Sequence, residues 1–269
     1  MDYPTLRMPN SGPPLLDFQN VSVMRGTKRA LERVTLRIHP GEHVAIIGPN
    51  GCGKSTLIKT ISRECYPLIE AGSSLTILGR QRWNVFELRA MLGIVSADMM
   101  MACTRDITGL ETVVSGFFSS VGVWPHHEVT PEMCALARGA LERLEAPHLA
   151  GRAMTEMSSG EARRVLIARA LVHNPRTLLL DEPSNSLDIR SQRELQQLLS
   201  RLAREGVGIL MVTHHLSDII PEIDRVILVC AGRVIADGPK AELLTGRRLE
   251  ELFGIPVSLA VRDGHYHLS

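Results

Sequence analysis

The nine residues GPNGCGKST, from Gly48 to Thr56, restrict the fold of this chain more than any other segment. They follow the short apolar run AII, which is typical of a buried β-strand, and they open a helical pattern over residues 54–63. A glycine-rich turn between a strand and a helix directs backbone N–H groups toward one point, where the helix N-terminus adds positive potential. The segment therefore predicts an α/β fold built around a phosphate-binding loop.

The side chains of this loop have distinct predicted roles. Lys54 is expected to reach the β- and γ-phosphates of a nucleotide, and the Ser55 hydroxyl is expected to bind Mg²⁺. The predicted nucleotide-binding residues are Gly48, Pro49, Asn50, Gly51, Cys52, Gly53, Lys54, Ser55 and Thr56. The alternative is a glycine-rich turn that binds nothing, which the strand-to-helix context disfavours.

Cys52 lies inside the loop, just before a helix N-terminus and beside Lys54. Both neighbours favour a thiolate, so alkylation of Cys52 is expected to block the site and bound ATP to slow the labelling. The alternative is an inert small residue that only fills the loop.

A second segment, TLLLDEPSNSLD at residues 177–188, also joins a strand to polar residues. Its apolar run ends in Asp181 and Glu182, and adjacent residues at a strand end point to different faces. Asp181 is expected to hold the metal, and Glu182 to orient or deprotonate an attacking water as the catalytic base. His214 ends another apolar run and is placed to contact the γ-phosphate. The alternative for the acidic pair is a solvated turn after a strand.

Composition excludes several classes of protein. Thirty Lys and Arg residues against 29 Asp and Glu leave a formal net charge of +1, which lacks the basic field of a nucleic-acid-binding protein. The five cysteines are odd in number and show no CxxC spacing, so neither a disulfide framework nor a zinc site is indicated. Residues 1–14 do not resemble a signal peptide, and the apolar stretch 113–124 is too short to span a bilayer. We expect a soluble, cytoplasmic protein.

Strand and helix patterns alternate along most of the chain. Apolar strand candidates occur at residues 15–23, 33–48, 178–183, 208–214 and 225–230, and helical patterns at 54–63, 131–145, 160–172 and 188–204. Short apolar strands between helices predict a mostly parallel sheet covered by helices. The expected fold class is an α/β P-loop NTPase core with an antiparallel β edge and an inserted helical subdomain.

Three parts of the chain are predicted: a disordered arm at residues 1–14, an ATP-binding domain at 15–245 with its helical subdomain at about 97–165, and an extension at 246–269. The extension reads as a short helix followed by two strands around Asp263-Gly264. His265 and His267 share a face of the last strand, either as metal ligands or as solvated residues.

Together, these motifs resemble those of the ATP-binding subunits of the ABC (ATP-binding cassette) family, over roughly residues 15–245. The segment MSSGE corresponds to the family's signature motif, usually LSGGQ. The resemblance implies that Ser158, Ser159, Gly160 and Glu161 bind the γ-phosphate of an ATP held by the P-loop of another subunit. It also implies that residues from Ser184 to Asp188 form the D-loop at the seam of a homodimer.

Two positions depart from the family pattern. Arg25 stands where an aromatic residue usually stacks on adenine, and a guanidinium plane can stack there as well. The Q-loop glutamine is absent at or next to Ala97. Three methionines that follow, Met99, Met100 and Met101, are expected to line a groove for a permease helix with Phe117 or Phe118; filling the helical subdomain's core is the alternative.

The resemblance implies an Mg²⁺-dependent ATPase that dimerises around two ATP molecules and drives a separate membrane permease from the inner face of the membrane. The strings VSADMM, SSGEARRVLIARALV and LFGIPVSLAVRDGHYH resemble a bacterial branch related to molybdate and iron-siderophore uptake ATPases, so import of a metal, an oxyanion or a siderophore is expected. The alternatives are a soluble ABC ATPase of repair or translation and a regulatory nucleotide binder.

Overall fold

The computed structural model describes residues 12–96, 98–99, 106–262 and 264–268. The predicted arm at residues 1–14 therefore falls almost wholly outside the described residues, as do Ala97, Met100 and Met101. In the described part, a six-stranded sheet has the order β5-β6-β7-β3-β8-β9. The strands are β3 Val44–Ile47, β5 Leu92–Val95, β6 Thr177–Asp181, β7 Gly208–Thr213, β8 Arg225–Cys230 and β9 Arg233–Pro239.

The central strands of this sheet are parallel, and only the edge strand β9 runs antiparallel to its neighbour β8. Strands β3, β6 and β7 are buried at every position, as their continuous apolar runs predict. The carboxyl ends of β3, β6 and β7 lead to the P-loop, to Glu182 and to His214. Pairing of these parallel strands thus brings the three motifs to one edge of the sheet.

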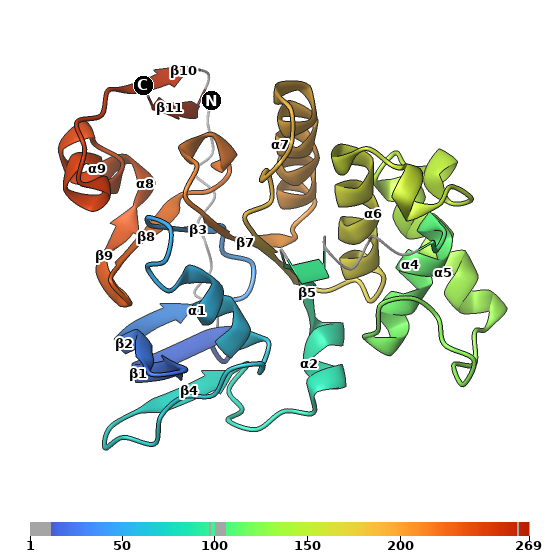
Figure 1. Cartoon of the computed structure of the whole chain (residues 1–269), viewed down its shortest axis with the longest axis horizontal. Helices are drawn as coiled ribbons and strands as arrows, with labels where there is room; N and C mark the ends of the chain where they lie inside the picture. The colour runs from blue at the N-terminus through green and yellow to red at the C-terminus, as the bar shows by residue number, and fades with distance from the viewer. Residues whose placement is uncertain (1–11, 97, 100–105, 263, 269) are drawn as a thin grey trace.

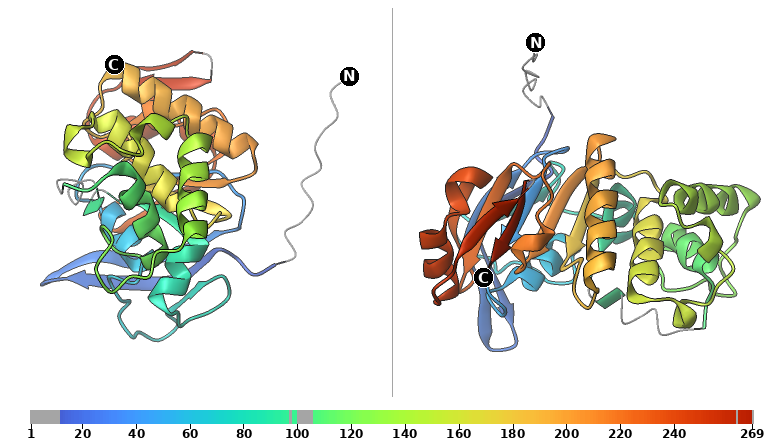
Figure 2. Two further views of the ribbon diagram at one scale, coloured as in Figure 1. Left: turned by 90° about the vertical axis from the view of Figure 1, so that its right-hand side faces the viewer. Right: turned by 90° about the horizontal axis from the view of Figure 1, so that it is seen from above.

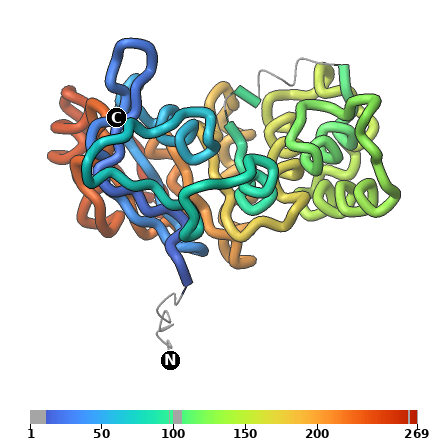
Figure 3. Tube along the Cα trace, turned by 90° about the horizontal axis from the view of Figure 1, so that it is seen from below, coloured from blue at the N-terminus to red at the C-terminus, as the bar shows by residue number. Residues whose placement is uncertain are grey.

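A second, antiparallel sheet has the order β2-β1-β4. It consists of β1 Leu16–Arg25, β2 Lys28–Ile38 and β4 Ser74–Ile77. Figure 3 shows that the hairpin between β1 and β2 projects from the body of the molecule. The expected fold class, a mostly parallel sheet with an antiparallel edge and surrounding helices, is confirmed.

Alternate residues of the central sheet enter two different cores. In β3, Val44 and Ile46 pack with β1, β2 and α1, whereas Ala45 and Ile47 pack with the helices on the other side. This alternation follows from the period of two along a strand. The helices are α1 Lys54–Ile61, α2 Val85–Met91, α4 Gly109–Val114, α5 Pro131–Arg143, α6 Ser159–Leu171, α7 Ile189–Arg204, α8 Lys240–Leu243 and α9 Gly246–Phe253.

Helices α4, α5 and α6 gather at one end of the molecule, on the far side of α7 from α1 (Figures 1 and 2). At the opposite end, α9 and the hairpin of β10 Leu259–Arg262 and β11 His265–Leu268 cover the core beside β8 and β9. Within the described residues, no helix is both long and apolar enough to cross a membrane.

Candidate nucleotide-binding site

The P-loop connects β3 to α1, and two of its glycines cannot be replaced without strain. A Cβ at Gly48 would lie 2.1 Å from the Val229 carbonyl oxygen. At Gly53, φ is +108° and a Cβ would lie 2.5 Å from the Ala30 carbonyl oxygen. The glycine requirement therefore comes from close backbone approach as well as from a left-handed conformation.

Lys54 is folded back onto its own loop. Its Nζ donates hydrogen bonds to the carbonyl oxygens of Gly48 at 2.8 Å and Pro49 at 3.0 Å, and it lies 3.8 Å from Glu182 Oε1. The side chain is only 4% exposed, so these acceptors compensate the burial of its charge. The ammonium group thus lies at the base of the phosphate loop, next to the candidate base.

A cavity of about 500 Å³ opens at this loop. Its lining comes from the β1–β2 hairpin, the P-loop and the end of β6: Arg25, Lys28, Ala30, Asn50, Gly51, Gly53, Lys54, Ser55, Thr56 and Glu182. The structure thus places Arg25 at the cavity, where adenine stacking is predicted. Lys28 was missed from the sequence; its position three residues after Arg25, across a tight turn, is the signal that could have found it.

Glu182 and His214 meet at the carboxyl ends of neighbouring strands. Glu182 Oε1 lies 3.0 Å from His214 Nδ1. Because an ionised carboxylate can only accept, Nδ1 carries the proton in this contact. Glu182 has a φ of +47°, and its backbone N–H donates to the Val212 carbonyl at 2.8 Å. A left-handed conformation at a non-glycine residue costs on the order of 1–3 kcal/mol, and here it turns the side chain toward the cavity.

Asp181, in contrast, is buried at the end of β6 and does not line the cavity surface. Its Oδ1 has no hydrogen-bond partner among the described residues. Burial, together with the adjacent Glu182 carboxylate, raises the pKa of Asp181 to about 6. The buried carboxylate with an unpaired oxygen and the hydroxyl of Ser55 in the P-loop cavity are hard oxygen donors of the kind that Mg²⁺ prefers.

The expected reactivity of Cys52 is wrong. Its side chain is only 4% exposed, and burial raises the pKa of the thiol despite the nearby Lys54. Desolvation disfavours the thiolate more than the lysine charge and the helix N-terminus favour it. Cys52 matches the alternative, a small residue that fills the loop.

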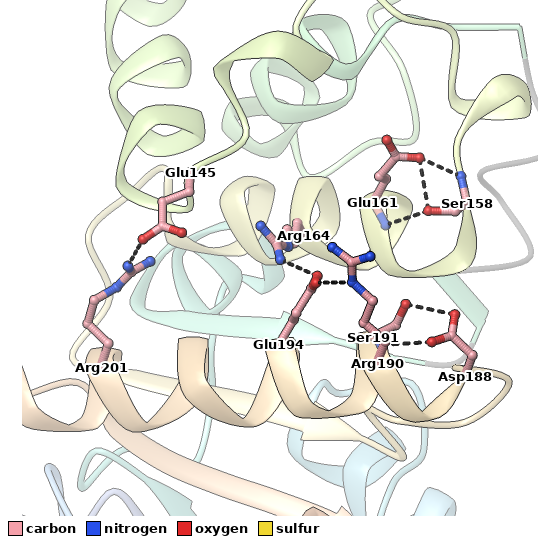
Figure 4. Close-up of polar contacts among 9 residues, drawn as sticks. All are labelled: Glu145, Ser158, Glu161, Arg164, Asp188, Arg190, Ser191, Glu194 and Arg201. Atoms are coloured by element: carbon pink, nitrogen blue, oxygen red, sulfur yellow. Dashed lines mark hydrogen bonds and ion pairs between the residues drawn. The ribbon is translucent and has the colours of Figure 1, made fainter.

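The predicted signature residues form the N-terminus of α6 (Figure 4). Ser158 is the N-cap: its Oγ accepts from the Glu161 backbone N–H at 3.3 Å, and Glu161 Oε2 accepts from the Ser158 backbone N–H at 2.8 Å. Ser158 and Ser159 are exposed, and a Cβ at Gly160 would meet Ser191 Oγ at 2.8 Å. Among the described residues, none from 158 to 161 lines the P-loop cavity.

The predicted D-loop lies between β6 and α7. Asp188 caps α7, its Oδ1 accepting from the Ser191 backbone N–H at 2.9 Å, whereas Ser184 is buried. The intervening Asn185 and Ser186 are exposed. This segment therefore presents polar residues to the outside, beside the signature end of α6 (Figure 4).

The predicted permease groove stays a prediction, and a cavity lies in the region where it is expected. A cavity of about 280 Å³ lies between β5, η1 (Ser115–Phe118) and the end of α6, and Met99, Val121 and Arg169 line it. Phe117 and Phe118 do not line it, which corrects that prediction. Phe117 instead packs edge-on against His173 and Phe118 stacks on His127, because both rings turn toward the helical core.

Sequence reasoning also missed Asp98, which directly follows Ala97. Its carboxylate lies 2.7 Å from Lys59 Nζ on α1. Lys59 is four residues after Ser55, so both share one face of α1. The signal in the sequence is an acidic residue directly after the position where the glutamine is absent.

Comparison with known proteins agrees with this geometry. The family model for ABC transporters matches residues 31–185. Hemin import ATP-binding protein HmuV of Bordetella avium is 36% identical over 253 residues, which cover 89% of this chain and 92% of the relative. Phosphonates import ATP-binding protein PhnC of Alcaligenes faecalis is 32% identical over 239 residues, covering 86% and 85% of the two chains.

The dimeric structure of MJ0796, a bacterial ABC transporter cassette, superimposes with a TM-score of 0.67 at 28% identity and covers 83% of this chain and 98% of that one. This chain therefore belongs to the ABC transporter family, in the class of its ATP-binding, ATP-hydrolysing subunits. The family predicted from the motifs is confirmed.

Proposed function

We propose that this chain binds ATP with Mg²⁺, dimerises with a second copy around two nucleotides, and drives an import permease at the inner face of the membrane. The observation that carries the proposal is the split of the ATP machinery. The P-loop and Glu182 line one cavity and His214 contacts Glu182, whereas the signature residues lie at the exposed start of α6. A second chain is needed to bring a signature helix to each P-loop.

Each side chain has a defined task in this proposal. Lys54 and the loop N–H groups bind the phosphates, and Arg25 stacks on the base. Asp181 and Ser55 would hold Mg²⁺, which neutralises charge on the phosphates when bound. Glu182 accepts a proton from the attacking water, and His214 holds the Glu182 carboxylate in place through Nδ1–H. From the second chain, Ser158 and the α6 N-terminus stabilise the γ-phosphate.

Asp98 completes the metal side of the site in place of the family's glutamine. Its carboxylate pairs with Lys59 on the α1 face that also carries Ser55. The charges of Asp98 and Lys59 also act on Asp181, Asp98 raising its pKa and Lys59 lowering it, which supports a role for Asp98 at this site. A carboxylate oxygen is a ligand that Mg²⁺ prefers, so Asp98 can serve the ion that Ser55 and Asp181 bind.

Import of an anionic or metal-bearing solute is the proposed transport reaction. The support is the pair of relatives named for hemin import and for phosphonates import, both aligned over most of their length. The cavity beside Met99 and Val121 is the proposed docking groove for the permease, since it lies at the junction between the sheet and the helices α4 to α6.

The deciding experiment compares Glu182→Gln with Lys54→Ala. Glu182→Gln keeps the shape and the nucleotide contacts but cannot accept the proton, so turnover should fall roughly 10²-fold or more while ATP binding persists. ATP·Mg²⁺ should then hold a dimer on gel filtration. Lys54→Ala should lose nucleotide affinity itself. A Glu182→Gln protein that stays monomeric with ATP·Mg²⁺ contradicts the two-chain site.

A further inference from the structure

The C-terminal hairpin presents a polar face that the nucleotide site does not use. In β10 and β11, Arg262 pairs with His265 and Ala260 pairs with His267. The period of two along each strand puts these four residues on one face. Tyr266 lies on the other face, buried to 8% exposure, and anchors the hairpin in the core.

Helix α7 presents a matching polar stripe. Arg193, Gln197, Ser200 and Arg204 are three or four residues apart, so they follow one another along one side of the helix. The buried leucines of α7 occupy other positions and face the sheet and its flanking helices. Figure 1 shows α7 and the hairpin on the same, upper side of the molecule.

These two faces enclose a cavity of about 1040 Å³, twice the volume of the cavity at the P-loop. Three arginines line it, Arg193 and Arg204 from α7 and Arg262 from β10, together with His265 and His267. Among the described residues of its lining, Glu222 alone carries a carboxylate, and it lies 3.7 Å from Arg204. Among the described residues, Arg193 and Arg262 form no ion pair, and the buried Nδ1 of His265 has no hydrogen-bond partner.

Such an arrangement favours one class of ligand. Among the described residues, three guanidinium groups face one carboxylate in this lining, so the positive charges are in excess, and an anion between them reduces their mutual repulsion. Arginine forks match phosphate oxygens in two-pronged hydrogen bonds. The lining is mostly polar, with Pro221 and Ala260 as its apolar members, so an apolar peptide does not fit.

We propose that the cavity between α7 and the β10–β11 hairpin binds a multiply charged, phosphate-bearing anion, as a second anion site separate from the P-loop. Arg193 on α7 and Arg262 on β10 hold it from opposite sides, and His265 and His267 contribute ring nitrogens. The bound anion joins the C-terminal hairpin to the helix whose N-terminus carries Asp188.

Calorimetric titration with inorganic tripolyphosphate tests the site. The protein carries Lys54→Ala and the buffer contains EDTA, so that neither the P-loop nor a metal contributes. We expect one equivalent to bind, and Arg193→Gln with Arg262→Gln to weaken it at least tenfold. The matched control, Arg82→Gln with Arg138→Gln, removes the same charge from exposed positions elsewhere and should bind like the parent.

Tripolyphosphate should also raise the melting temperature of the parent and the control, but not of the cavity variant. If both double variants bind tripolyphosphate equally weakly, the effect comes from net charge and the proposal is overturned. Absence of binding to the parent overturns it as well. Failure here leaves the Glu182→Gln and Lys54→Ala results untouched, since those report on the P-loop.

Vesicles distinguish a free solute from a lipid headgroup as the source of the phosphate. Co-sedimentation with phosphatidylcholine vesicles that contain phosphatidic acid, lost in the cavity variant alone, assigns the site to a headgroup. Binding of tripolyphosphate without co-sedimentation assigns it to a solute. If an acidic peptide displaces tripolyphosphate and no other phosphate compound does, the site binds a protein partner and the proposal is overturned.

Discussion

Glu161 stands where the family has glutamine, and its contacts explain why the carboxylate is tolerated. The Ser158 backbone N–H, the Ser158 hydroxyl and the Arg152 guanidinium all donate to it and together hold the pKa of Glu161 below its usual value of 4.5. The charge at this helix N-terminus is favourable as well. The carboxylate therefore caps α6, and its charge is compensated by these donors.

Changing Glu161 to Gln should keep ATPase activity and lower stability in a pH-dependent way. Since the folded-state pKa is lowered, ionised Glu161 stabilises the fold above pH 4.5, and this contribution is lost as pH falls through the folded-state pKa. The melting temperature of Glu161→Gln should lie below that of the wild type at pH 7, and the two should converge in acid. A difference that is constant across pH would show that the ionised form contributes nothing.

Asp98 gives a prediction that does not depend on turnover. Asp98→Ala should weaken Mn²⁺ binding, measured by electron paramagnetic resonance in the presence of a non-hydrolysable ATP analogue, by about tenfold, the loss of one oxygen ligand. Asp98→Gln, which restores the family's residue, should retain metal affinity. Lys59→Met serves as a second variant, because it removes the ion-pair partner of the Asp98 carboxylate and should not weaken Mn²⁺ binding. Unchanged affinity in Asp98→Ala excludes Asp98 as a ligand.

Between the helices, charged pairs join α6 and the end of α5 to α7 (Figure 4). Glu194 on α7 accepts from Arg164 on α6 at 2.7 Å and from Arg190 at 3.0 Å. Arg201 pairs with Glu145, and Arg143 pairs with Glu205 at 2.7 Å. These contacts connect the signature helix to the helix that Asp188 caps.

Removing the central acid of this network should have a measurable effect. We expect Glu194→Gln to lower the free energy of unfolding by about 0.5–1 kcal/mol, because it breaks the partly buried pair with Arg164 together with the exposed pair with Arg190. The control is Glu251→Gln, whose i,i+4 partner Arg247 is 88% exposed and whose loss should be near the limit of detection. Urea titrations of both variants measure this difference. An equal loss of unfolding free energy in each would mean that the network adds nothing beyond isolated surface pairs.

The whole molecule holds only half of each proposed ATP site, and this has a testable consequence. Lys54→Ala inactivates the P-loop of its own chain, and Ser158→Arg blocks the signature of its own chain. In a mixed dimer both defects fall in one site, and the other site pairs an intact P-loop with an intact signature. ATPase activity should therefore reappear when the two inactive proteins are mixed. A site formed within one chain predicts no recovery at any ratio.

Docking of the permease can be separated from ATP binding. Val121 lines the groove beside Met99, and Val121→Glu places a charge there. We expect this variant to bind ATP and melt normally but to lose co-purification with a co-expressed permease subunit, since burying an unpaired carboxylate is unfavourable. Leu136→Glu, at an exposed position of α5, is the control and should co-purify. Co-purification of both variants removes this groove as the docking site.

Much of the fold follows from local sequence. The continuous apolar runs of β3, β6 and β7, the glycine spacing before Lys54 and the adjacent Asp181 and Glu182 are short-range patterns, and a strand end or a tight turn needs no distant partner to set its geometry. The short strand β5 and the edge strand β9 escaped prediction. β9 is half-exposed at alternate positions and ends in Gly238-Pro239, so its pattern resembles a loop until β8 pairs with it.

Other properties depend on contacts between residues far apart in the chain. Burial of Cys52 under neighbouring elements reverses the reactivity that its local sequence suggests. Packing of Phe117 and Phe118 against His173 and His127 removes them from the groove. Arg193 and Arg204 of α7 are 69 and 58 residues away from Arg262 of β10, and only packing of the hairpin beside α7 brings them to one cavity. The sequence determines the type of each side chain. The packing of the elements determines its solvation and its neighbours, and these set its charge and reactivity.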